Sequence, residues 1–466
     1  MRKVACTIIL GLSALVMFGQ DVTGQWNGIL KVPGAQLRLV FHVEKTETGY
    51  ASTMDSPDQG ANGLPVETTT FADATIRFTI PAAGIEYEGV LGSDGVIAGN
   101  FKQAGQLFPM NLTREVIEKE ILKRPQEPTK PYPYHSEDIT FKNEKAGIEL
   151  AGTLTLPNKD GVFPVVILIS GSGPQNRDEE LLGHKPFLVL SDYLTRNGIA
   201  VLRYDDRGTA ASKGNFGTAT SKDFATDVEA GVTYLLGRKE INKKKIGLIG
   251  HSEGGVVAPM VAVNSKNIAF IVLLAGTGIP GGELLLLQQA LISKVYGVSD
   301  EDVAKAQDYN RGAYAIVTAS TDIEQLKTDL TSYYNTRFKD NPDFEVPQGM
   351  TADELIQSMV DQLANPWMQY FIQHDPAPVL EKVKCPVLAL NGEKDLQVPP
   401  KENLGAIEAA LKKGGNKKGT FQELPGLNHL FQECTTGSPE EYASIEQTMS
   451  PAALTQILAW VNVQTK

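Results

Sequence analysis

From residue 137 onward, short apolar runs of strand length alternate with segments of helical periodicity. A strand that is covered on both faces gives a continuous apolar run, because neither face meets water. Such runs occupy Val165–Ser170, Ile199–Tyr204, Lys245–Ile249, Ala269–Leu274, Pro386–Leu390 and Thr420–Leu424. Apolar residues with helical spacing follow Pro186, Ser221, Gly254 and Pro451. We expect Ser221 and Ser450 to be the N-cap residues of the second and the last of these helices. The alternation predicts an α/β fold with a mostly parallel sheet flanked by helices.

A long helix-rich segment interrupts this alternation at residues 280–380. A plain crossover between two strands of one sheet needs far fewer residues, and long insertions are usually functional lids. We therefore expect a helical cap at residues 280–380. It would separate a first part of the core, residues 137–279, from a second part, residues 381–466.

The segment before the core has a different pattern. Residues 21–115 contain short alternating segments between Gly, Pro and Asp turns, which predicts a small antiparallel β domain, either a barrel or a sandwich. Residues 116–136 are charged and then rich in proline, so we expect an extended linker.

Residues 1–20 have the pattern of a secretory signal peptide. Arg2 and Lys3 precede an apolar run from Val4 to Phe18, which is too short for a comfortable membrane span. We expect an exported protein, periplasmic or extracellular, with no membrane span.

Composition excludes several classes of protein. The chain has 43 Lys and Arg against 55 Asp and Glu, a net charge of −12, which argues against a nucleic-acid partner. Its three cysteines, Cys6, Cys385 and Cys434, lack the close spacing of a zinc site or a disulfide scaffold. Cys385 and Cys434 could pair in an oxidising compartment, although single buried thiols are the commoner arrangement.

The segment Gly250-His251-Ser252-Glu253-Gly254 matches the Gly-x-Ser-x-Gly nucleophile elbow. The pattern alone is weak in a chain with 44 glycines. Here a buried strand leads into it and an apolar helix of small residues follows, which is the context that an elbow requires. We expect Ser252 to be a nucleophile.

A serine nucleophile needs a histidine base and an acid that orients it. Of the six histidines, His429 follows the last core strand and would lie at the same edge of the sheet as the elbow, with His184 as the next candidate. The acid should follow a strand between them. Asp395 fits best, and Glu393 in the same turn is the rival.

A tetrahedral intermediate also needs donors for its oxyanion. We expect one from the backbone N–H of Glu253 and one from the loop after Ser170, either Ser172 or its alternative Gly173. The candidates for the substrate pocket are Gly173, His184, Trp367, Tyr370 and Phe371.

The segment Gly276–Gly281 spells Gly-x-Gly-x-x-Gly after a strand. It lies late in the sheet, Pro280 crowds the turn, and no further βαβ half follows, so we do not expect dinucleotide binding. Clustered metal ligands are also missing from the sequence. We expect neither a cofactor nor a metal.

Five segments together resemble one known superfamily: Ser170–Asp178, Arg203–Gly208, Gly250–Gly255, Asn391–Asp395 and Gly426–His429. They look like the α/β-hydrolase superfamily, in particular exported bacterial serine esterases related to the acyl-CoA thioesterase and dienelactone hydrolase groups. The resemblance covers roughly residue 135 to the C-terminus and includes a loop signature in which Arg207 braces its neighbours. The β domain also resembles one that precedes this core in some exported esterases.

The resemblance implies an α/β-hydrolase fold and hydrolysis of small-molecule carboxylic esters, with short acyl chains favoured by the size of the cap. Two features depart from the family pattern: Ser170-Gly171 replaces a common His-Gly, and the cap is larger than in dienelactone hydrolases. A serine aminopeptidase or amidase, with an acid such as Glu283 holding the substrate amino group, is the alternative. A binding protein that acts through the β domain is the alternative of another class. The sequence does not indicate the oligomeric state.

Overall fold

A computed structural model describes residues 21–32, 35–59, 61–103, 106–118, 123–339, 346 and 350–466. The expected signal peptide, residues 1–20 with Cys6, lies outside the described residues. The chain separates into two compact units. Unit 1 comprises residues 1–120 and 347–350, and unit 2 comprises residues 121–346 and 351–466.

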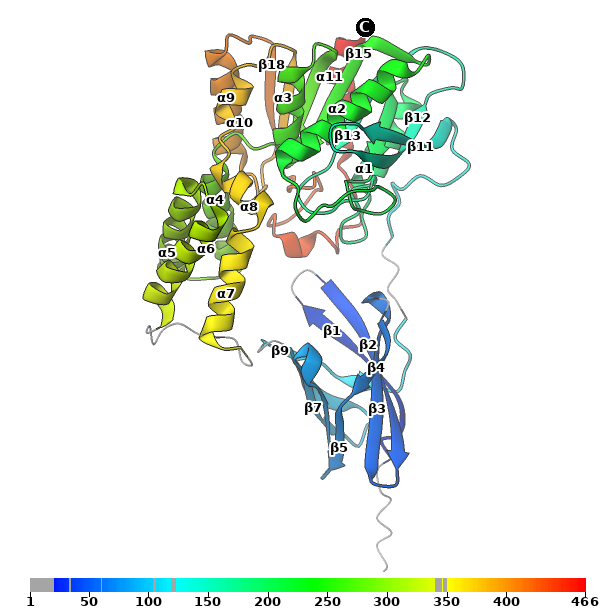
Figure 1. The fold of residues 1–466 in the computed structure, drawn as a ribbon. Coiled ribbons are helices and arrows are strands. Elements are labelled where there is room, and N and C mark those ends of the chain that lie inside the picture. Colours follow the sequence, from blue (N-terminus) through cyan, green and yellow to red (C-terminus); the bar gives the residue numbers. More distant parts are fainter. Residues whose placement is uncertain are drawn as a thin grey trace, which may run out of the picture. The chain divides into compact units, whose positions relative to one another are not determined.

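Unit 1 is an antiparallel β domain (Figure 1). Its strands pair in the order β4-β3-β2-β1-β10-β8-β7-β6-β5, and β9 pairs with β8. Their bounds are β1 Gly24–Val32, β2 Ala35–Thr46, β3 Gly49–Ser56, β4 Ala61–Val66, β5 Thr68–Ala72, β6 Thr75–Ile80, β7 Ile85–Leu91, β8 Ile97–Gln103, β9 Gln106–Pro109 and β10 Leu112–Thr113. The predicted small all-β domain is confirmed.

The sheet of unit 1 curls around an aromatic core. Phe41 on β2 stacks on Phe78 on β6, with ring centroids 4.4 Å apart. Four strands separate β2 from β6 in the sheet order, so their rings can meet only if the sheet folds back on itself. Tyr87 on β7 packs against both rings and is buried.

Unit 2 contains an eight-stranded sheet in the order β11-β12-β14-β13-β15-β16-β17-β18. Pairing is antiparallel from β11 through β12 to β14 and parallel from β14 to β18. The bounds are β11 His135–Asn143, β12 Ile148–Leu156, β13 Phe163–Ile169, β14 Ala200–Tyr204, β15 Ile241–His251, β16 Ile268–Leu274, β17 Val387–Gly392 and β18 Gly419–Leu424. The predicted α/β-hydrolase fold is confirmed. The β11–β12 hairpin was not predicted, and His135, which we placed in the linker, begins β11.

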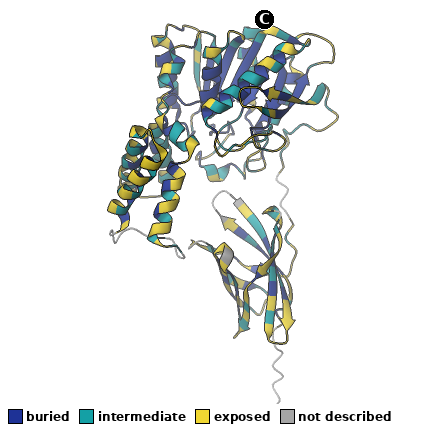
Figure 2. Cartoon of the chain, in the orientation of Figure 1, coloured by how far each residue is buried: buried dark blue, intermediate teal, exposed yellow. Residues whose placement is uncertain are grey.

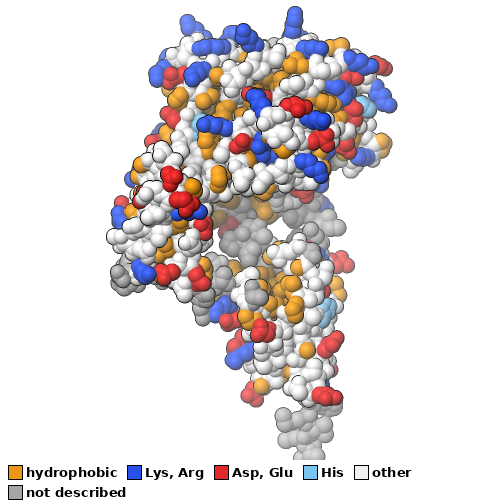
Figure 3. Space-filling view, in the orientation of Figure 1, with side chains coloured by type: hydrophobic (Ala, Val, Ile, Leu, Met, Phe, Trp, Pro, Cys, Tyr) orange, Lys and Arg blue, Asp and Glu red, His pale blue; other side chains and the backbone are white. Residues whose placement is uncertain are grey.

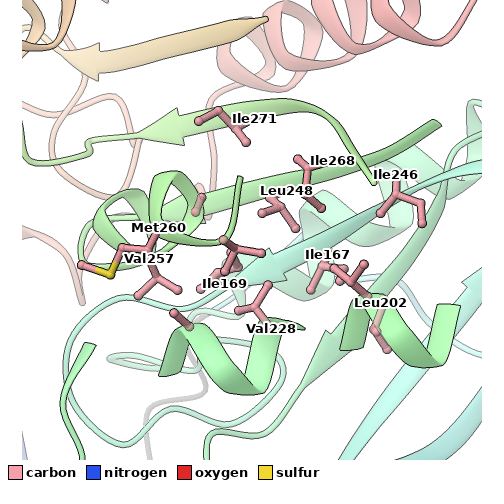
Figure 4. Packing of buried hydrophobic residues seen from close by; sticks show 14 of the residues in the cluster. Ile167, Ile169, Leu202, Val228, Ile246, Leu248, Val257, Met260, Ile268 and Ile271 are labelled. Atoms are coloured by element: carbon pink, nitrogen blue, oxygen red, sulfur yellow. The ribbon is translucent and has the colours of Figure 1, made fainter. Parts of the chain in front are cut away.

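Helices cover both faces of this sheet (Figures 1 and 2). Along β13, Ile167 packs with α2 and α3, whereas its neighbours Val166 and Leu168 pack with α1 and α11. Successive side chains of a strand point to opposite faces, so an entirely apolar strand supplies both layers. Figure 4 shows the first of these layers. The helices are α1 Pro186–Arg196, α2 Ser221–Gly237, α3 Gly254–Asn264, α10 Pro400–Lys413 and α11 Pro451–Thr465.

The expected N-cap residue of α11, Ser450, is confirmed, but the N-cap of α2 is Thr220 and not the expected Ser221. The Ser450 hydroxyl accepts a hydrogen bond from Ala452 N–H. At α2 the residue before the helix is Thr220, whose N–H and hydroxyl both donate to Asp223 Oδ2. Ser221 is instead the first helical residue, and its buried hydroxyl donates to Glu253.

The segment between β16 and β17 is helical, as predicted for the cap. Ten buried residues from several of its helices form a separate apolar cluster, which includes Leu326, Leu330 and Val360. The helices are α4 Gly281–Val295, α5 Asp300–Ala319, α6 Ile323–Tyr334, the π-helical turn Asn335–Lys339, α7 Ala352–Leu363, α8 Pro366–Gln373 and α9 Ala377–Leu380. None of the helices in the described ranges is both long and apolar enough to cross a membrane.

Lys and Arg side chains gather at the end of unit 2 that carries the C-terminus (Figure 3). Exposed Lys243 and Lys244 lie near the start of β15, whereas Ser252 follows the end of that strand. This basic end is therefore opposite the expected site.

Cys385 and Cys434 are both unpaired thiols, and burial raises the pKa of Cys385 to about 11.

Substitution of Leu248 tests the packing of the central sheet. It lies on β15 with 0% of its surface exposed, so Leu248→Ala should leave a cavity and lower the free energy of unfolding by about 2–5 kcal/mol. Urea unfolding followed by circular dichroism measures the change. Val162→Ala, at a residue that is 63% exposed, is the matched control and should shift stability by less than about 0.5 kcal/mol. Equal effects of the two substitutions would contradict the proposed packing.

Candidate active site

Ser252 occupies a sharp turn between β15 and α3. Its φ is +51°, in the left-handed region that residues with a Cβ rarely adopt. The Ser252 N–H donates to Leu274 O on β16 at 2.8 Å, which ties the turn to the neighbouring strand. The turn therefore has the geometry of the nucleophile elbow that the sequence predicts.

Glycines on either side of Ser252 permit this turn. A Cβ at Gly250 would collide with the Gly254 backbone, and a Cβ at Gly254 would collide with Ile169 O. Because both residues lack a Cβ, α3 can start directly against the ends of β13 and β15, and the serine lies at the carboxyl edge of the sheet.

His429 and Asp395 form a buried pair. His429 Nδ1 lies 2.8 Å from Asp395 Oδ2, and the two residues are 5% and 2% exposed. The other carboxylate oxygen, Oδ1, accepts from the backbone N–H groups of Gln397 and Val398, both at 2.9 Å. An ionised carboxylate can only accept, so Nδ1 of His429 carries the proton and Nε2 is left as a base.

Glu393, the rival acid, has a different contact. Its Oε2 accepts from Gly426 N–H at 2.8 Å and so joins the loops after β17 and β18. The structure thus brings Asp395, and not Glu393, into contact with His429.

His251 links the elbow to the His429 loop. Its Nε2 donates to His429 O at 3.0 Å, and the two imidazole centroids are 4.9 Å apart. Since His251 directly precedes Ser252, this bond holds His429 beside the elbow. Within the described part of the chain, no hydrogen bond joins the Ser252 hydroxyl to the His429 ring.

His251 also contacts Glu179. Its Nδ1 lies 2.9 Å from Glu179 Oε1. Both ring nitrogens therefore face acceptors, which requires a proton on each and favours the imidazolium form. Burial alone lowers the pKa of His251, but the charge and hydrogen bond of Glu179 raise it above the usual value. The elbow thus rests on a buried ion pair.

Two buried acidic side chains hold the loop after β13. Glu179 Oε1 accepts from Gly171 N–H at 2.7 Å. Asp206 accepts from the Ser170 hydroxyl at 2.7 Å and from Gln175 N–H at 2.9 Å. Together they fix both ends of the segment that contains Ser172 and Gly173.

This loop lies close to the candidate nucleophile. A Cβ built at Gly171 would be 3.3 Å from Ser252 Cβ. The Gly171 N–H is already bound to Glu179, whereas the N–H groups of Ser172 and Glu253 have no acceptor within the described ranges. Ser172 and Glu253 thus have free N–H groups in the two segments predicted to supply oxyanion donors.

Glu253 connects the elbow to the cap. Its Oε1 accepts from the Ser221 hydroxyl at 2.5 Å and from Trp367 Nε1 on α8 at 2.8 Å. Burial raises the pKa of Glu253, and these two hydrogen bonds lower it only in part. The cap therefore reaches the residue next to Ser252.

Trp367, one of the expected pocket residues, makes this contact, and two others lie near it. Phe371 stacks on Trp367 with centroids 5.1 Å apart, and the charge of Glu253 adds to burial in raising the pKa of Tyr370 to about 12. His184 lies elsewhere: its Nδ1 contacts Thr448 and its Nε2 contacts Tyr442 O, and the ring is fully buried. Gly173, at φ +91°, lies in the loop after β13.

The roles of Glu179 and His251 in holding the loops were not predicted from the sequence. Glu179 follows directly on the Ser170–Asp178 motif, which was the available signal. Arg207, expected to brace its surroundings, forms a buried ion pair with Asp227 on α2. No group of three or more His, Cys, Asp and Glu side chains in the described ranges could hold a metal ion.

Comparisons with known proteins point to hydrolases. A family model described as X-Pro dipeptidyl-peptidase (S15 family) matches residues 146–422. Esterase EstD of Thermotoga maritima is 27% identical over 306 residues, which are 65% of this chain. The match spans 61% of the length of that relative.

Solved structures with similar folds include two hydrolases. The α/β hydrolase GrgF from Penicillium sp. has a TM-score of 0.45 and 17% identity, covering 71% of this chain and 99% of that one. The Pyrococcus furiosus esterase Pf2001 has a TM-score of 0.43 and 15% identity, covering 75% of this chain and 100% of that one.

The raised pKa of Asp206 predicts that stability depends on pH. Burial, together with the charges of Glu253 and Glu179, raises its pKa to about 8 despite the hydrogen bonds from Ser170 and Gln175. The folded state then binds this proton more tightly than the unfolded state, so the contribution to stability falls as pH rises from about 4 to about 8.

Asp206→Asn should remove this contribution. The amide can still accept from Gln175 N–H and donate to the Ser170 hydroxyl. The free energy of unfolding should therefore decrease less between about pH 5 and pH 8 in the variant than in the wild type, as measured by urea unfolding. An unchanged pH dependence would show that Asp206 titrates near its ordinary value.

Proposed function

The chain belongs to the X-Pro dipeptidyl-peptidase (S15) family, and on that premise we propose that it is a serine hydrolase that cleaves carboxylic esters. The observation that carries the proposal is the buried pair of His429 and Asp395, whose Nδ1 and Oδ2 atoms are 2.8 Å apart. His251 holds this pair beside the left-handed turn of Ser252. A base oriented by an acid next to a serine on an elbow is the arrangement that acyl transfer requires.

The proposed reaction begins with attack of Ser252 Oγ on the ester carbonyl carbon, while His429 Nε2 accepts the hydroxyl proton. Collapse of the tetrahedral intermediate breaks the bond to the alcohol oxygen, which takes the proton from His429. Water then attacks the acyl-enzyme by the same route and releases the acid. Asp395 keeps the proton of His429 on Nδ1 throughout and stabilises the imidazolium.

The proposed oxyanion donors are the backbone N–H groups of Glu253 and Ser172, with Gly173 as the alternative to Ser172. Support comes from the position of the loop, since Gly171 approaches Ser252 closely and its own N–H is bound to Glu179. Donors fixed before the reaction stabilise the developing charge without reorganising.

An ester is the substrate class that we favour, and a short acyl chain is the form we propose. The relative in Thermotoga maritima is named an esterase. The stacked Trp367 and Phe371 lie at the junction of α8 with the elbow, where bulky rings would shorten an acyl pocket.

Hydrolysis of X-Pro dipeptide amides is the second candidate, because the matching family model bears the description X-Pro dipeptidyl-peptidase. A free substrate ammonium would need a carboxylate near Ser252. Glu253 is buried there, and its two hydrogen-bond partners, Ser221 and Trp367, are uncharged. Under this alternative, Glu253→Gln would reduce amide cleavage far more than ester cleavage.

Substitution of Ser252 tests the proposed nucleophile. Wild-type protein should hydrolyse p-nitrophenyl esters from acetate to palmitate, and Ser252→Ala should lower kcat/KM by at least about 1000-fold because the acyl-enzyme cannot form. Ser265→Ala, at the far end of α3, is the control and should retain activity. An X-Pro p-nitroanilide is assayed in parallel.

Either of two outcomes would contradict the ester proposal. Persistent ester hydrolysis in Ser252→Ala would remove Ser252 as nucleophile. Cleavage of the p-nitroanilide without turnover of any ester would select the peptidase alternative.

Trp367→Ala tests the acyl-chain preference. Loss of the indole should lengthen the pocket, so kcat/KM for octanoate relative to acetate should rise by roughly 10-fold or more. Trp367→Phe keeps a ring but removes the N–H that Glu253 accepts, so it separates filling of the pocket from the hydrogen bond. An unchanged chain-length profile in both variants would place the acyl group elsewhere.

A further inference from the structure

A cavity of about 1060 Å³ opens in unit 2, and its lining does not include Ser252. Its walls come from the linker at residues 130–134, the β11–β12 hairpin, β14, and the segment that follows β13. Neither Ser252, Asp395 nor His429 lines it. The proposed hydrolysis therefore does not account for this cavity.

A buried arginine with an unused donor lines the cavity. The Arg203 side chain is 6% exposed, and its Nη1 forms an ion pair with Asp178. Its Nε is buried and finds no hydrogen-bond acceptor among the described residues. Burial lowers the pKa of Arg203 to about 10, so the guanidinium remains charged at neutral pH. A buried guanidinium is stabilised when its remaining donors meet an anion.

The neighbouring arginine differs in this respect. Arg177 Nε and Nη2 bind the two oxygens of Asp205 at 3.0 and 2.7 Å, and its Nη1 lies 3.1 Å from Asp138 Oδ1. The donors of Arg177 are thus satisfied by carboxylates of the chain, which leaves Arg203 as the arginine available to bind a ligand.

Aromatic rings form the adjacent wall. Tyr132 and Tyr134 stack with centroids 5.2 Å apart, and Lys130 Nζ lies 5.8 Å from the Tyr132 ring centroid. The Tyr134 hydroxyl donates to Asp192 at 2.9 Å, which anchors the pair. A flat apolar surface beside a cation fits a ligand with a flat ring and an anionic group.

The charge of the lining supports an anion. Four cationic side chains line the cavity, Lys130, Lys159, Arg177 and Arg203, against two carboxylates, Asp138 and Asp178. This excess of positive charge is found in a chain whose net charge is −12.

We propose that this cavity is a second binding site, for a small aromatic carboxylate whose carboxylate group pairs with Arg203 and whose ring packs on Tyr132. The ligand would share the guanidinium with Asp178 and place its ring against the partly exposed Tyr132. The site is independent of the Ser252 chemistry.

Calorimetric titration of the full chain with benzoate tests the site. Benzoate should bind, and both Arg203→Gln and Tyr132→Ala should weaken its affinity, Arg203→Gln by about 10- to 100-fold because a charged hydrogen-bonded pair is lost. Benzamide, which has the ring without the charge, should bind much more weakly. Ser252→Ala and Arg77→Gln, the latter at an exposed position on β6 of unit 1, should bind benzoate as the wild type does.

The proposal is overturned if the wild type does not bind benzoate, if Tyr132→Ala leaves the affinity unchanged, or if Ser252→Ala abolishes binding. Inorganic phosphate binding more tightly than benzoate would overturn the ligand class. Circular dichroism checks each variant, and should Arg203→Gln fail to fold, Tyr132→Ala and the benzamide comparison decide. Loss of esterase activity in Ser252→Ala with benzoate binding retained would separate the two sites.

Discussion

The left-handed backbone of Ser252 is the constraint on which the rest of unit 2 depends. A residue with a Cβ holds this conformation at a cost of about 1–3 kcal/mol unless its surroundings over-determine it. Here the turn is held by a hydrogen bond to Leu274 on β16 and by the close approach of Gly250 on β15 and Gly254 on α3 to their neighbours. The order of the strands then brings the loops that follow β13, β17 and β18 to the same edge.

Buried acids organise these loops. Glu179, Asp206, Glu253 and Asp395 are all less than a tenth exposed, and each accepts hydrogen bonds from a loop or from the cap. A buried acidic side chain is tolerated only when its oxygens have hydrogen-bond partners, so each of these acids specifies one arrangement of its loop. Charged and polar side chains near the elbow thus hold the backbone in place, and His251 contributes a cation in contact with Glu179.

Much of the fold was accessible from the sequence because apolar runs and helical spacing are local properties. The β11–β12 hairpin was missed because neither strand has a continuous apolar run. β11 is the edge strand and is partly exposed, whereas β12 is buried from Leu150 to Leu156 but carries Gly152, Thr153 and Thr155 within that stretch. At the site, Asp395 and His429 could be proposed because each follows a predicted strand. Glu253 was expected at the elbow, but its bond to Trp367 joins residues 114 positions apart, which no local pattern encodes.

By itself the sequence determined the alternation of strands and helices, the elbow around Ser252, and the order of the candidate serine, acid and histidine along the chain. Only the tertiary structure decided that Asp395 and not Glu393 contacts His429, that Glu179 and Asp206 hold the loop after β13, and that a cavity with a buried Arg203 lies apart from the elbow. The physical reason is that periodicity reports which face of an element is buried, whereas hydrogen bonds between distant loops depend on where the packed elements place them.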